Sequence, residues 1–320
     1  MPGARLLEAY RRTGADPPFG DPRRAHGLEL EGYYWRLTDA AAGRVVVALG
    51  AVCRSPRGDW GLVALAGHPG GYVRWALTET ARADPARLGV VAGDALAASA
   101  DRLRVDLGPG ARLDVRFSRP IGWPRAAFGA LGAAHALPGL PQYWHPHLLG
   151  ARVRGEARLG DDRVDLSSAT AYAEKNWGPS FSEHWWWGQA QAFDGADACV
   201  AFAGGRIELP GIAAAPTALV LRLGGDVLRF SPPLARMTAA VGEGGWRVTA
   251  RSARHSVELE GDSAGRAPVL LPVPVPAQRC VEVRSRQYLA GRVSVRVLRR
   301  RLTLFAGESA LAGLERGGPA

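Results

Sequence analysis

Residues 293–298 read Val-Ser-Val-Arg-Val-Leu, and their alternation is the cleanest in the chain. Side chains along a β-strand point alternately to the two faces of a sheet, so a period of two predicts a strand with one buried face. Similar alternation occurs at residues 28–32, 72–77, 102–107 and 113–117, and glycine-rich turns separate many of these runs. The pattern predicts antiparallel sheets in a sandwich or a barrel.

The predicted strands form two runs, and an apolar segment rich in alanine, glycine and proline separates them. We therefore expect an all-β protein with two antiparallel β-barrel or β-sandwich domains and only a few short helices. The N-terminal domain is expected over residues 28–142, with an apolar connector or lid at about 119–142. The C-terminal β-barrel domain is expected over residues 143–320, and residues 1–27 are expected to form a polar lead-in.

Composition and charge narrow the classes of function. The 320 residues are 47% hydrophobic and 22% charged, which is typical of a globular protein. The net charge of +10 would suit nucleic acid or an acidic membrane surface. However, the arginines are scattered singly except at residues 299–301, and no nucleic-acid-binding motif is present. We therefore expect no nucleic-acid partner, whereas a peripheral contact with acidic lipids stays open.

The cysteines and the apolar segments indicate a cellular compartment. Cys53, Cys199 and Cys280 are far apart and show neither metal-binding spacing nor a disulfide framework. Residues 1–16 lack the apolar core of a secretory signal, and no apolar run reaches the length needed to span a membrane. We expect a cytoplasmic protein, or one at the periphery of a membrane, and the sequence does not predict its oligomeric state.

Residues 172–179, Tyr-Ala-Glu-Lys-Asn-Trp-Gly-Pro, stand out in composition. Lys175 is the only lysine of the chain and Asn176 is the only asparagine. Two single residues placed at random would be neighbours in roughly one case in 160. Lysine differs from arginine in shape and hydration, and an asparagine amide both donates and accepts hydrogen bonds. The stretch therefore predicts a functional site; a buried polar corner that only satisfies backbone groups is the alternative.

Strand alternation would place Tyr172, Glu174 and Asn176 on one face and Lys175 and Trp177 on the other. Burial in an apolar lumen raises the pKa of a carboxyl, so Glu174 could donate a proton near neutral pH. Indole rings stabilise a nearby cation. An ammonium group beside Glu174 would keep its carboxylate ionised, but the alternation places Lys175 on the opposite face. The pattern therefore favours Glu174 as an acid.

Aromatic and polar residues elsewhere are candidates for substrate binding. His145 and His147 could hold a metal, but no third ligand is evident nearby and we expect none to be bound. A substrate-orienting role fits these two histidines better. The chain contains no hydrolase triad motif, P-loop or dinucleotide fingerprint. The candidate substrate-binding residues are Trp177, Trp185, Trp187, Trp144, His145, His147, Gln189 and Tyr34.

Residues 172–178 and the tryptophan run at 185–187 resemble the Tyr-x-Glu-Lys-Asn-Trp-Gly segment of the tocopherol cyclase family. Residues 31–34, Glu-Gly-Tyr-Tyr, are similar to an early Glu-Gly-Trp-Tyr motif of that family, with Tyr33 in place of tryptophan. Supporting segments lie at residues 203–205 with 209–211, 255–259 and 308–315. The alanine- and arginine-rich composition resembles that of a bacterial member.

The resemblance implies a lipocalin-like architecture in two parts and the cyclisation of a prenylated hydroquinone to a chromanol, with no cofactor. An alkene would be protonated, and the phenol oxygen would capture the resulting cation. Chemistry then makes Glu174 the candidate acid, with Tyr172 and Asn176 orienting the phenol or the acid. Lys175 would be a structural or electrostatic partner.

Two other functions stay open at the level of the sequence. One is a lipocalin-like protein that binds a prenyl lipid or another isoprenoid without catalysis. The other is a hydratase, in which water captures the same cation. The length of the prenyl tail and the substitution of the ring cannot be predicted.

Overall fold

The computed structural model describes Arg5 and residues 28–85, 87–124, 127–136, 140–209 and 212–318. Apart from Arg5, the predicted lead-in over residues 1–27 lies outside these residues, as do Pro210 and Gly211 of the glycine-rich segment. From residue 28 on, the described chain is almost entirely strand, interrupted by 3-10 helices at Gly132–Ala136 and Pro276–Gln278. The all-β prediction is confirmed. No helix in the described part of the chain is long and apolar enough to cross a membrane.

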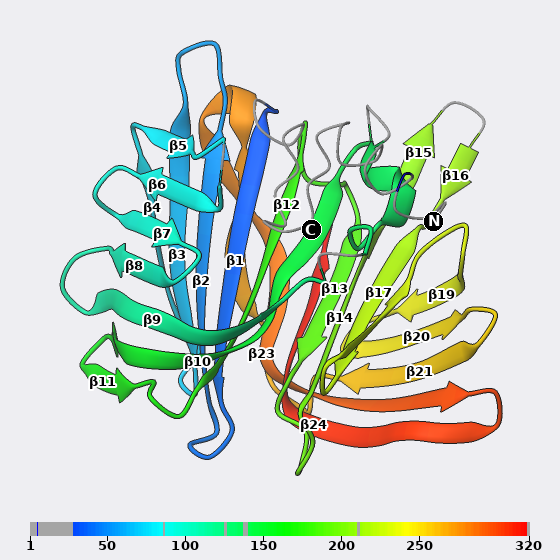
Figure 1. Ribbon diagram of the computed structural model, residues 1–320. Helices are drawn as coiled ribbons and strands as arrows, with labels where there is room; N and C mark the ends of the chain where they lie inside the picture. Colours follow the sequence, from blue (N-terminus) through cyan, green and yellow to red (C-terminus); the bar gives the residue numbers. More distant parts are fainter. Residues whose placement is uncertain are drawn as a thin grey trace. The chain divides into compact units, whose positions relative to one another are not determined.

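The chain divides into two compact units, described here one at a time. Unit 1 comprises Met1–Phe181 and Pro272–Val283, and unit 2 comprises Ser182–Leu271 and Arg284–Ala320. Each contains a large antiparallel sheet that nearly closes into a barrel (Figure 1).

The sheet of unit 1 has the strand order β4-β3-β2-β1-β12-β10-β9-β8-β7-β6-β5, with β11 paired to β10. Its strands are β1 Leu30–Asp39, β2 Arg44–Cys53, β3 Trp60–His68, β4 Tyr72–Thr78, β5 Ala81–Ala83, β6 Gly89–Ala92, β7 Leu96–Ser99, β8 Arg102–Asp106, β9 Ala111–Gly122, β10 Tyr143–Leu159, β11 Asp162–Asp165 and β12 Thr170–Gly178.

The core of unit 1 follows from alternation along these strands. From Ala111 to Ser118, β9 alternates strictly between buried and exposed residues, as its sequence predicts. The central strands β1 and β12 differ, because nearly all of their residues are buried. On these two strands one set of alternate side chains, including Trp35 and Ala173, joins the hydrophobic core. The other set points to the opposite face of the sheet and is also largely buried.

The second large sheet lies mostly in unit 2 and has the order β18-β17-β14-β13-β24-β23-β21-β20-β19, with β22 paired to β23, and β15 and β16 form a separate hairpin. Most of β22 and the start of β23 belong to unit 1. The strands are β13 Trp185–Ala190, β14 Ala198–Gly205, β15 Ile207–Leu209, β16 Ile212–Ala214, β17 Thr217–Leu223, β18 Asp226–Phe230, β19 Arg236–Val241, β20 Gly245–Arg251, β21 His255–Asp262, β22 Val269–Val275, β23 Cys280–Arg299 and β24 Leu302–Gly317. The alternating stretch 293–298 lies on β23, and its three valines are buried in the core of unit 2.

The division of the chain differs from the predicted one. The sequence suggested a boundary at residues 142 and 143, but residues 143–181 belong to unit 1. The reason is pairing between distant strands, because β12 pairs with both β1 and β10 and so completes the N-terminal sheet. The segment 119–142 also belongs to unit 1, so it does not connect the two units.

Candidate active site

The stretch singled out by its lysine and asparagine forms β12, near the middle of the unit 1 sheet. Lys175 lies opposite Tyr33 of β1 and His145 of β10. Residues directly opposite one another in antiparallel strands share a face, so these three side chains lie on the core side of the sheet. Glu174 lies opposite Tyr34 and therefore points to the other face. The predicted separation of Lys175 from Glu174 agrees with this register.

A buried ion pair occupies the core side. The ammonium nitrogen of Lys175 lies 3.0 Å from Oε2 of Glu31, and both side chains have 0% exposure. Arg54 approaches the other oxygen of Glu31 at 2.8 Å, and the Tyr33 hydroxyl donates to Oε2 at 3.4 Å. Two cations and a phenol stabilise the ionised form of this carboxyl. Glu31 is therefore suited to holding Lys175 in place and not to donating a proton.

Aromatic rings surround the same ammonium group. Nζ of Lys175 lies 5.1 Å from the ring centroid of Tyr33 and 5.7 Å from that of Trp177, within the range of cation–π attraction. Trp177 in turn stacks on Tyr143, with the ring centroids 5.4 Å apart and the planes 3° from parallel. Tyr33 thus offers an aromatic face to Lys175. The structure places Trp177 with Lys175 and on the face opposite to that of Glu174.

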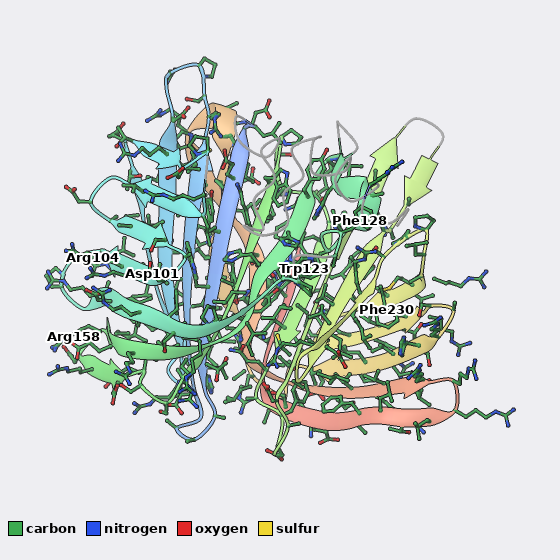
Figure 2. The ribbon with its side chains drawn as sticks, viewed as in Figure 1. Asp101, Arg104, Trp123, Phe128, Arg158 and Phe230 are labelled. Atoms are coloured by element: carbon green, nitrogen blue, oxygen red, sulfur yellow. The ribbon has the colours of Figure 1, made fainter. Side chains whose placement is uncertain are left out.

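Histidines extend this aromatic cluster. The ring of His145 lies 4.7 Å from that of Trp123 and 5.5 Å from that of His135, and its Nδ1 accepts a hydrogen bond from the amide of Ala130. Nε2 of His135 donates to the carbonyl oxygen of Trp144 at 3.2 Å. Gly129 leaves room for His135, since a Cβ there would come within 2.0 Å of its ring. In Figure 2, Trp123 lies near Phe128, whose carbonyl oxygen accepts a hydrogen bond from its indole at 3.0 Å.

The histidine pair of β10, His145 and His147, was a candidate metal site in the sequence. His145 and His147 are 1% and 8% exposed, and the register of β10 against β12 shifts after Pro146, between the two histidines. The described residues contain no group of three histidine, cysteine, aspartate or glutamate side chains that could hold a metal ion. His145 instead contacts the rings of Trp123 and His135 and the backbone amide of Ala130.

The opposite face of β12 carries a carboxyl and a phenol in direct contact. The Tyr172 hydroxyl donates to Oε2 of Glu174 at 2.5 Å, and the two residues are 0% and 4% exposed. Tyr34 lies opposite Glu174, and it forms a hydrogen bond with the fully buried Arg36. Burial lowers the pKa of the Arg36 guanidinium, whereas the hydrogen bond to Tyr34 raises it. This face therefore combines an acid with polar groups held away from water.

Asn176 is a further polar residue of β12 on the face of Tyr172 and Glu174. It lies opposite Gly32 on β1 and Trp144 on β10, and a Cβ on Gly32 would come within 2.4 Å of the Asn176 side-chain oxygen. Only glycine at this position therefore leaves the amide undisturbed. Within the described residues, the buried Asn176 Oδ1 and the buried Trp144 Nε1 have no hydrogen-bond partner. A buried acceptor and a buried donor of this kind are rare in native proteins and call for a ligand, a water or an ion.

Three of the predicted binding residues lie in unit 2 and form a cluster of their own. Trp185 and Gln287 donate to the two carboxyl oxygens of Glu315, each at 2.6 Å, and Trp187 lies opposite Glu315 in the register. Glu315 is half-buried, and burial of its carboxyl raises its pKa, while hydrogen bonds from Trp185, Gln287 and Ser285 lower it in part. The side-chain amide of Gln189 donates to the sulfur of Cys199 at 3.6 Å.

Comparison with known proteins decides the family. A model of the tocopherol cyclase-like family matches residues 115–318. This chain belongs to that family. The maize chloroplast tocopherol cyclase is 29% identical over 175 residues, an alignment that covers 50% of this chain and 37% of the maize protein. Only about a third of the curated relative is therefore matched by this member of the family.

Solved structures share the fold of this tocopherol cyclase-like protein. Kievitone hydratase from Nectria haematococca superimposes with a TM-score of 0.57 at 11% identity, over 96% of this chain and 92% of the hydratase. CghA in complex with Sch210972 superimposes with a TM-score of 0.62 at 12% identity, over 91% and 88% of the two chains. At such low identity these likenesses show the fold alone.

The sequence did not assign a role to three residues of these clusters. Glu31 was quoted only as part of a family motif, and its contact with Lys175 joins strands that are 144 residues apart in the chain. Glu315 belongs to the last supporting segment, and nothing in that segment predicts its contacts with Trp185 and Gln287. His135 showed only a loose helical spacing with its neighbours. For Glu31 and Glu315 the contacting residues Lys175 and Trp185 are distant in the chain, so local patterns could not predict these contacts.

Proposed function

We propose that this protein catalyses the acid-promoted cyclisation of a prenylated hydroquinone to a chromanol. A proton adds to the alkene carbon that leaves a tertiary cation, and a phenol oxygen of the same molecule attacks that cation. The phenol then loses its proton, so one proton enters and one leaves. The product is an isomer of the substrate, the reaction involves no change in oxidation state, and the enzyme would be an intramolecular lyase.

The proposed proton donor is Glu174. Its Oε2 accepts a hydrogen bond from Tyr172, so Oε1 is the oxygen that would carry the transferable proton. After transfer, the Tyr172 hydroxyl would stabilise the new carboxylate. The ammonium of Lys175 pairs with Glu31 on the other face of the strand and does not hold Glu174 ionised. A positioned acid of this type contributes about 10²–10⁴-fold to a rate.

One observation carries the proposal. Asn176 Oδ1 and Trp144 Nε1 are buried polar atoms without a partner among the described residues, and register places both on the face of Glu174 and Tyr172. An unsatisfied acceptor costs about 1–3 kcal/mol when buried, and a phenol hydroxyl of the substrate would satisfy it. We therefore propose that Asn176 orients the phenol. The indole Nε1 of Trp144 would donate a hydrogen bond to a second polar atom of the substrate ring.

The remaining candidates receive supporting roles. Lys175, Glu31 and Arg54 form a charged cluster that holds β1 against β12, so Lys175 is assigned a structural role. Trp177 packs with Lys175 and Tyr143, which suits it to supporting the strand rather than to facing a cation near Glu174. Tyr34 lies opposite Glu174 and is retained as a substrate-binding residue.

The test is an anaerobic incubation of the purified protein with a prenylated hydroquinone, followed by chromatography and mass spectrometry. A product of unchanged mass with a shifted retention time supports cyclisation. A gain of one water would favour the hydratase, in which water captures the cation. Bound but unchanged substrate over a series of tail lengths would contradict catalysis and favour a lipid-binding protein.

A further inference from the structure

Six arginines gather at one end of the unit 2 sheet. They come from the start of β19, the β20–β21 turn and the β23–β24 turn, and the ends of these strands lie together in Figure 1. Register joins them, since Arg236 lies opposite Arg251, and the amide of Arg300 donates to the carbonyl oxygen of Arg254 at 3.2 Å. The six residues are Arg236, Arg251, Arg254, Arg299, Arg300 and Arg301, and we call them the basic end.

The charge of the basic end is not neutralised by neighbours. All six arginines are exposed, and none of them forms an ion pair with an acidic residue in the part of the chain that the structure describes. Arginines toward the other ends of the same strands are paired instead. These pairs are Arg247 with Glu260, Arg292 with Asp262 and Arg316 with Glu243, at 2.9 to 3.1 Å. Positive charge is therefore concentrated at one end of the sheet.

Exposed leucines flank the basic end. Leu302 follows Arg301 directly and is 66% exposed, and Leu304, two residues later, is 42% exposed. Leu234, just before β19, is 74% exposed. Leu302 and Leu304 are two residues apart on a strand, so their side chains share a face. Exposed large apolar residues beside a concentration of arginine are characteristic of surfaces that enter the interface of a membrane.

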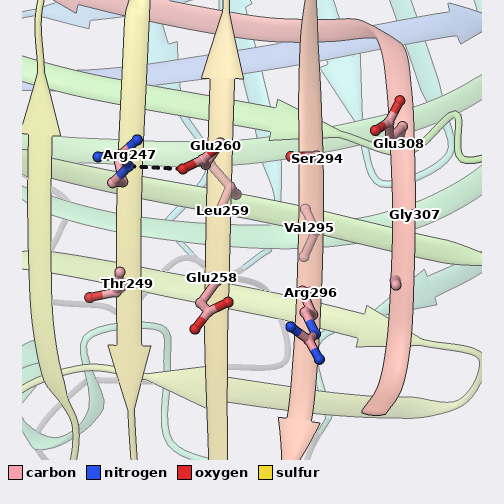
Figure 3. A pocket seen from close by; sticks show the side chains of 11 residues that line it. Arg247, Thr249, Glu258, Leu259, Glu260, Ser294, Val295, Arg296, Gly307 and Glu308 are labelled. Carbon is pink, nitrogen blue, oxygen red and sulfur yellow. Dashed lines mark hydrogen bonds and ion pairs between the residues drawn. The ribbon is translucent and has the colours of Figure 1, made fainter.

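An acidic groove lies farther along the same strands, and none of the six arginines of the basic end lines it. It has a volume of about 560 Å³ and runs across β20, β21, β23 and β24 (Figure 3). Three glutamates and two arginines line it: Glu258, Glu260, Glu308, Arg247 and Arg296. Because acidic side chains outnumber basic ones in the groove, an anionic surface would be attracted to the end of the sheet and not to this face.

We propose that the basic end and its leucines dock unit 2 on a lipid bilayer that carries anionic headgroups. Arginine binds phosphate and carboxylate groups with two parallel hydrogen bonds, and the leucines would enter the boundary between headgroups and acyl chains. Nucleic acid would match the charge but would leave the leucines in water. Docking on a membrane is independent of the proposed catalysis, because it rests only on the charge and exposure of these arginines and leucines. A docked protein would lie next to a substrate that is dissolved in the membrane.

The test is co-sedimentation of the full chain with vesicles of phosphatidylcholine, alone or with about a third of the lipid replaced by phosphatidylserine. The wild type should bind only the anionic vesicles, and added salt should weaken the binding. The triple variant Arg299→Gln/Arg300→Gln/Arg301→Gln should bind about a hundredfold more weakly. The double variant Leu302→Ser/Leu304→Ser should also bind more weakly.

The matched control is Arg247→Gln/Arg292→Gln/Arg316→Gln, which removes the same charge from paired arginines of the same sheet. It should bind anionic vesicles as the wild type does. An equal loss of affinity for anionic vesicles in the two triple variants would overturn the proposal, because the net charge of the protein and not the basic end would then determine the affinity. Absence of binding to anionic vesicles, or tighter binding to duplex DNA at the same salt concentration, would overturn it as well. Turnover of a detergent-dispersed substrate should be the same in all variants.

Discussion

Three glutamates with buried or half-buried side chains differ in what contacts their carboxyl groups. Glu31 contacts a lysine and an arginine, Glu174 contacts a phenol, and Glu315 contacts an indole and an amide. Two cations keep a carboxyl ionised, whereas hydrogen bonds from neutral donors favour the ionised form less strongly and are opposed by burial. The three carboxyls therefore differ in role, and Glu174 shares its face of the strand with the buried, unsatisfied Asn176 Oδ1 and Trp144 Nε1.

The first prediction concerns Glu174. Glu174→Gln keeps the shape of the side chain but removes the proton, so turnover should fall by about 10²–10⁴-fold. Substrate affinity, measured by equilibrium binding, should change little. Tyr172→Phe is the companion variant and should lower turnover by a smaller factor, because it only removes a hydrogen bond to the carboxylate. Turnover that survives Glu174→Gln would remove this residue from the mechanism.

Stability should distinguish Glu31 from Glu174. Glu31→Gln leaves the ammonium of Lys175 buried without its counter-ion, and breaking a buried pair in this way costs about 3–5 kcal/mol. Urea unfolding should therefore show a much lower free energy of unfolding for Glu31→Gln than for Glu174→Gln. Similar stabilities of the two variants would mean that the charged cluster on the core side does not hold β1 against β12.

Glu315 should make the stability of the protein depend on pH. Burial raises the pKa of Glu315 above its value in the unfolded chain. Its contribution to stability is therefore fully present at acidic pH and is lost as the pH rises through the raised pKa. Glu315→Gln cannot ionise, so its unfolding free energy should lack this decline. The free energy of unfolding of the two proteins is measured in urea over a series of pH values. If it depends on pH in the same way in both, ionisation of Glu315 does not cause the decline.

At the scale of elements, β12 shows how far the sequence could predict the site. Alternation correctly separated Tyr172 and Glu174 from Lys175 and Trp177, because the period of a strand is a local property. The partner strands were not predictable, because β12 pairs with a strand more than 130 residues earlier in the chain. For the same reason the sequence placed the domain boundary too early. Local patterns predict where strands lie and which side chains share a face of a strand. Pairing between strands that are distant in the chain determines which of these side chains come into contact.

The close approach of β1 to β12 gives a prediction at this scale. In Gly32→Ala the new methyl group would meet the side-chain oxygen of Asn176, which is 2.4 Å away. Asn176 can rotate, so stability should change modestly, but its oxygen would be displaced. We expect turnover to fall by up to about 10²-fold, since misplacement by about 1 Å can have that effect. Gly225→Ala is the control, because nothing lies within 4 Å of that position. Equal turnover in both variants would contradict the role of Asn176.

At the scale of the molecule, a family member with two all-β units carries a separate buried carboxyl cluster in each unit. The cluster of unit 1 lies on the strand that holds the family motif, and the cluster of unit 2 lies on the strand of the tryptophan run. The basic end of unit 2 offers a surface for an anionic membrane. The residues proposed for catalysis, for stability and for membrane docking are different, so each property should be open to change without the others.

The most direct test of the central claim is the reaction of wild-type protein with a prenylated hydroquinone in deuterium oxide under anaerobic conditions. We expect a chromanol with one deuterium bound to the carbon that was protonated, detected by mass spectrometry after exchangeable sites are returned to hydrogen. Glu174→Gln should form this product far more slowly. A cyclised product without deuterium on carbon would contradict protonation of the alkene by an acid that exchanges with the solvent.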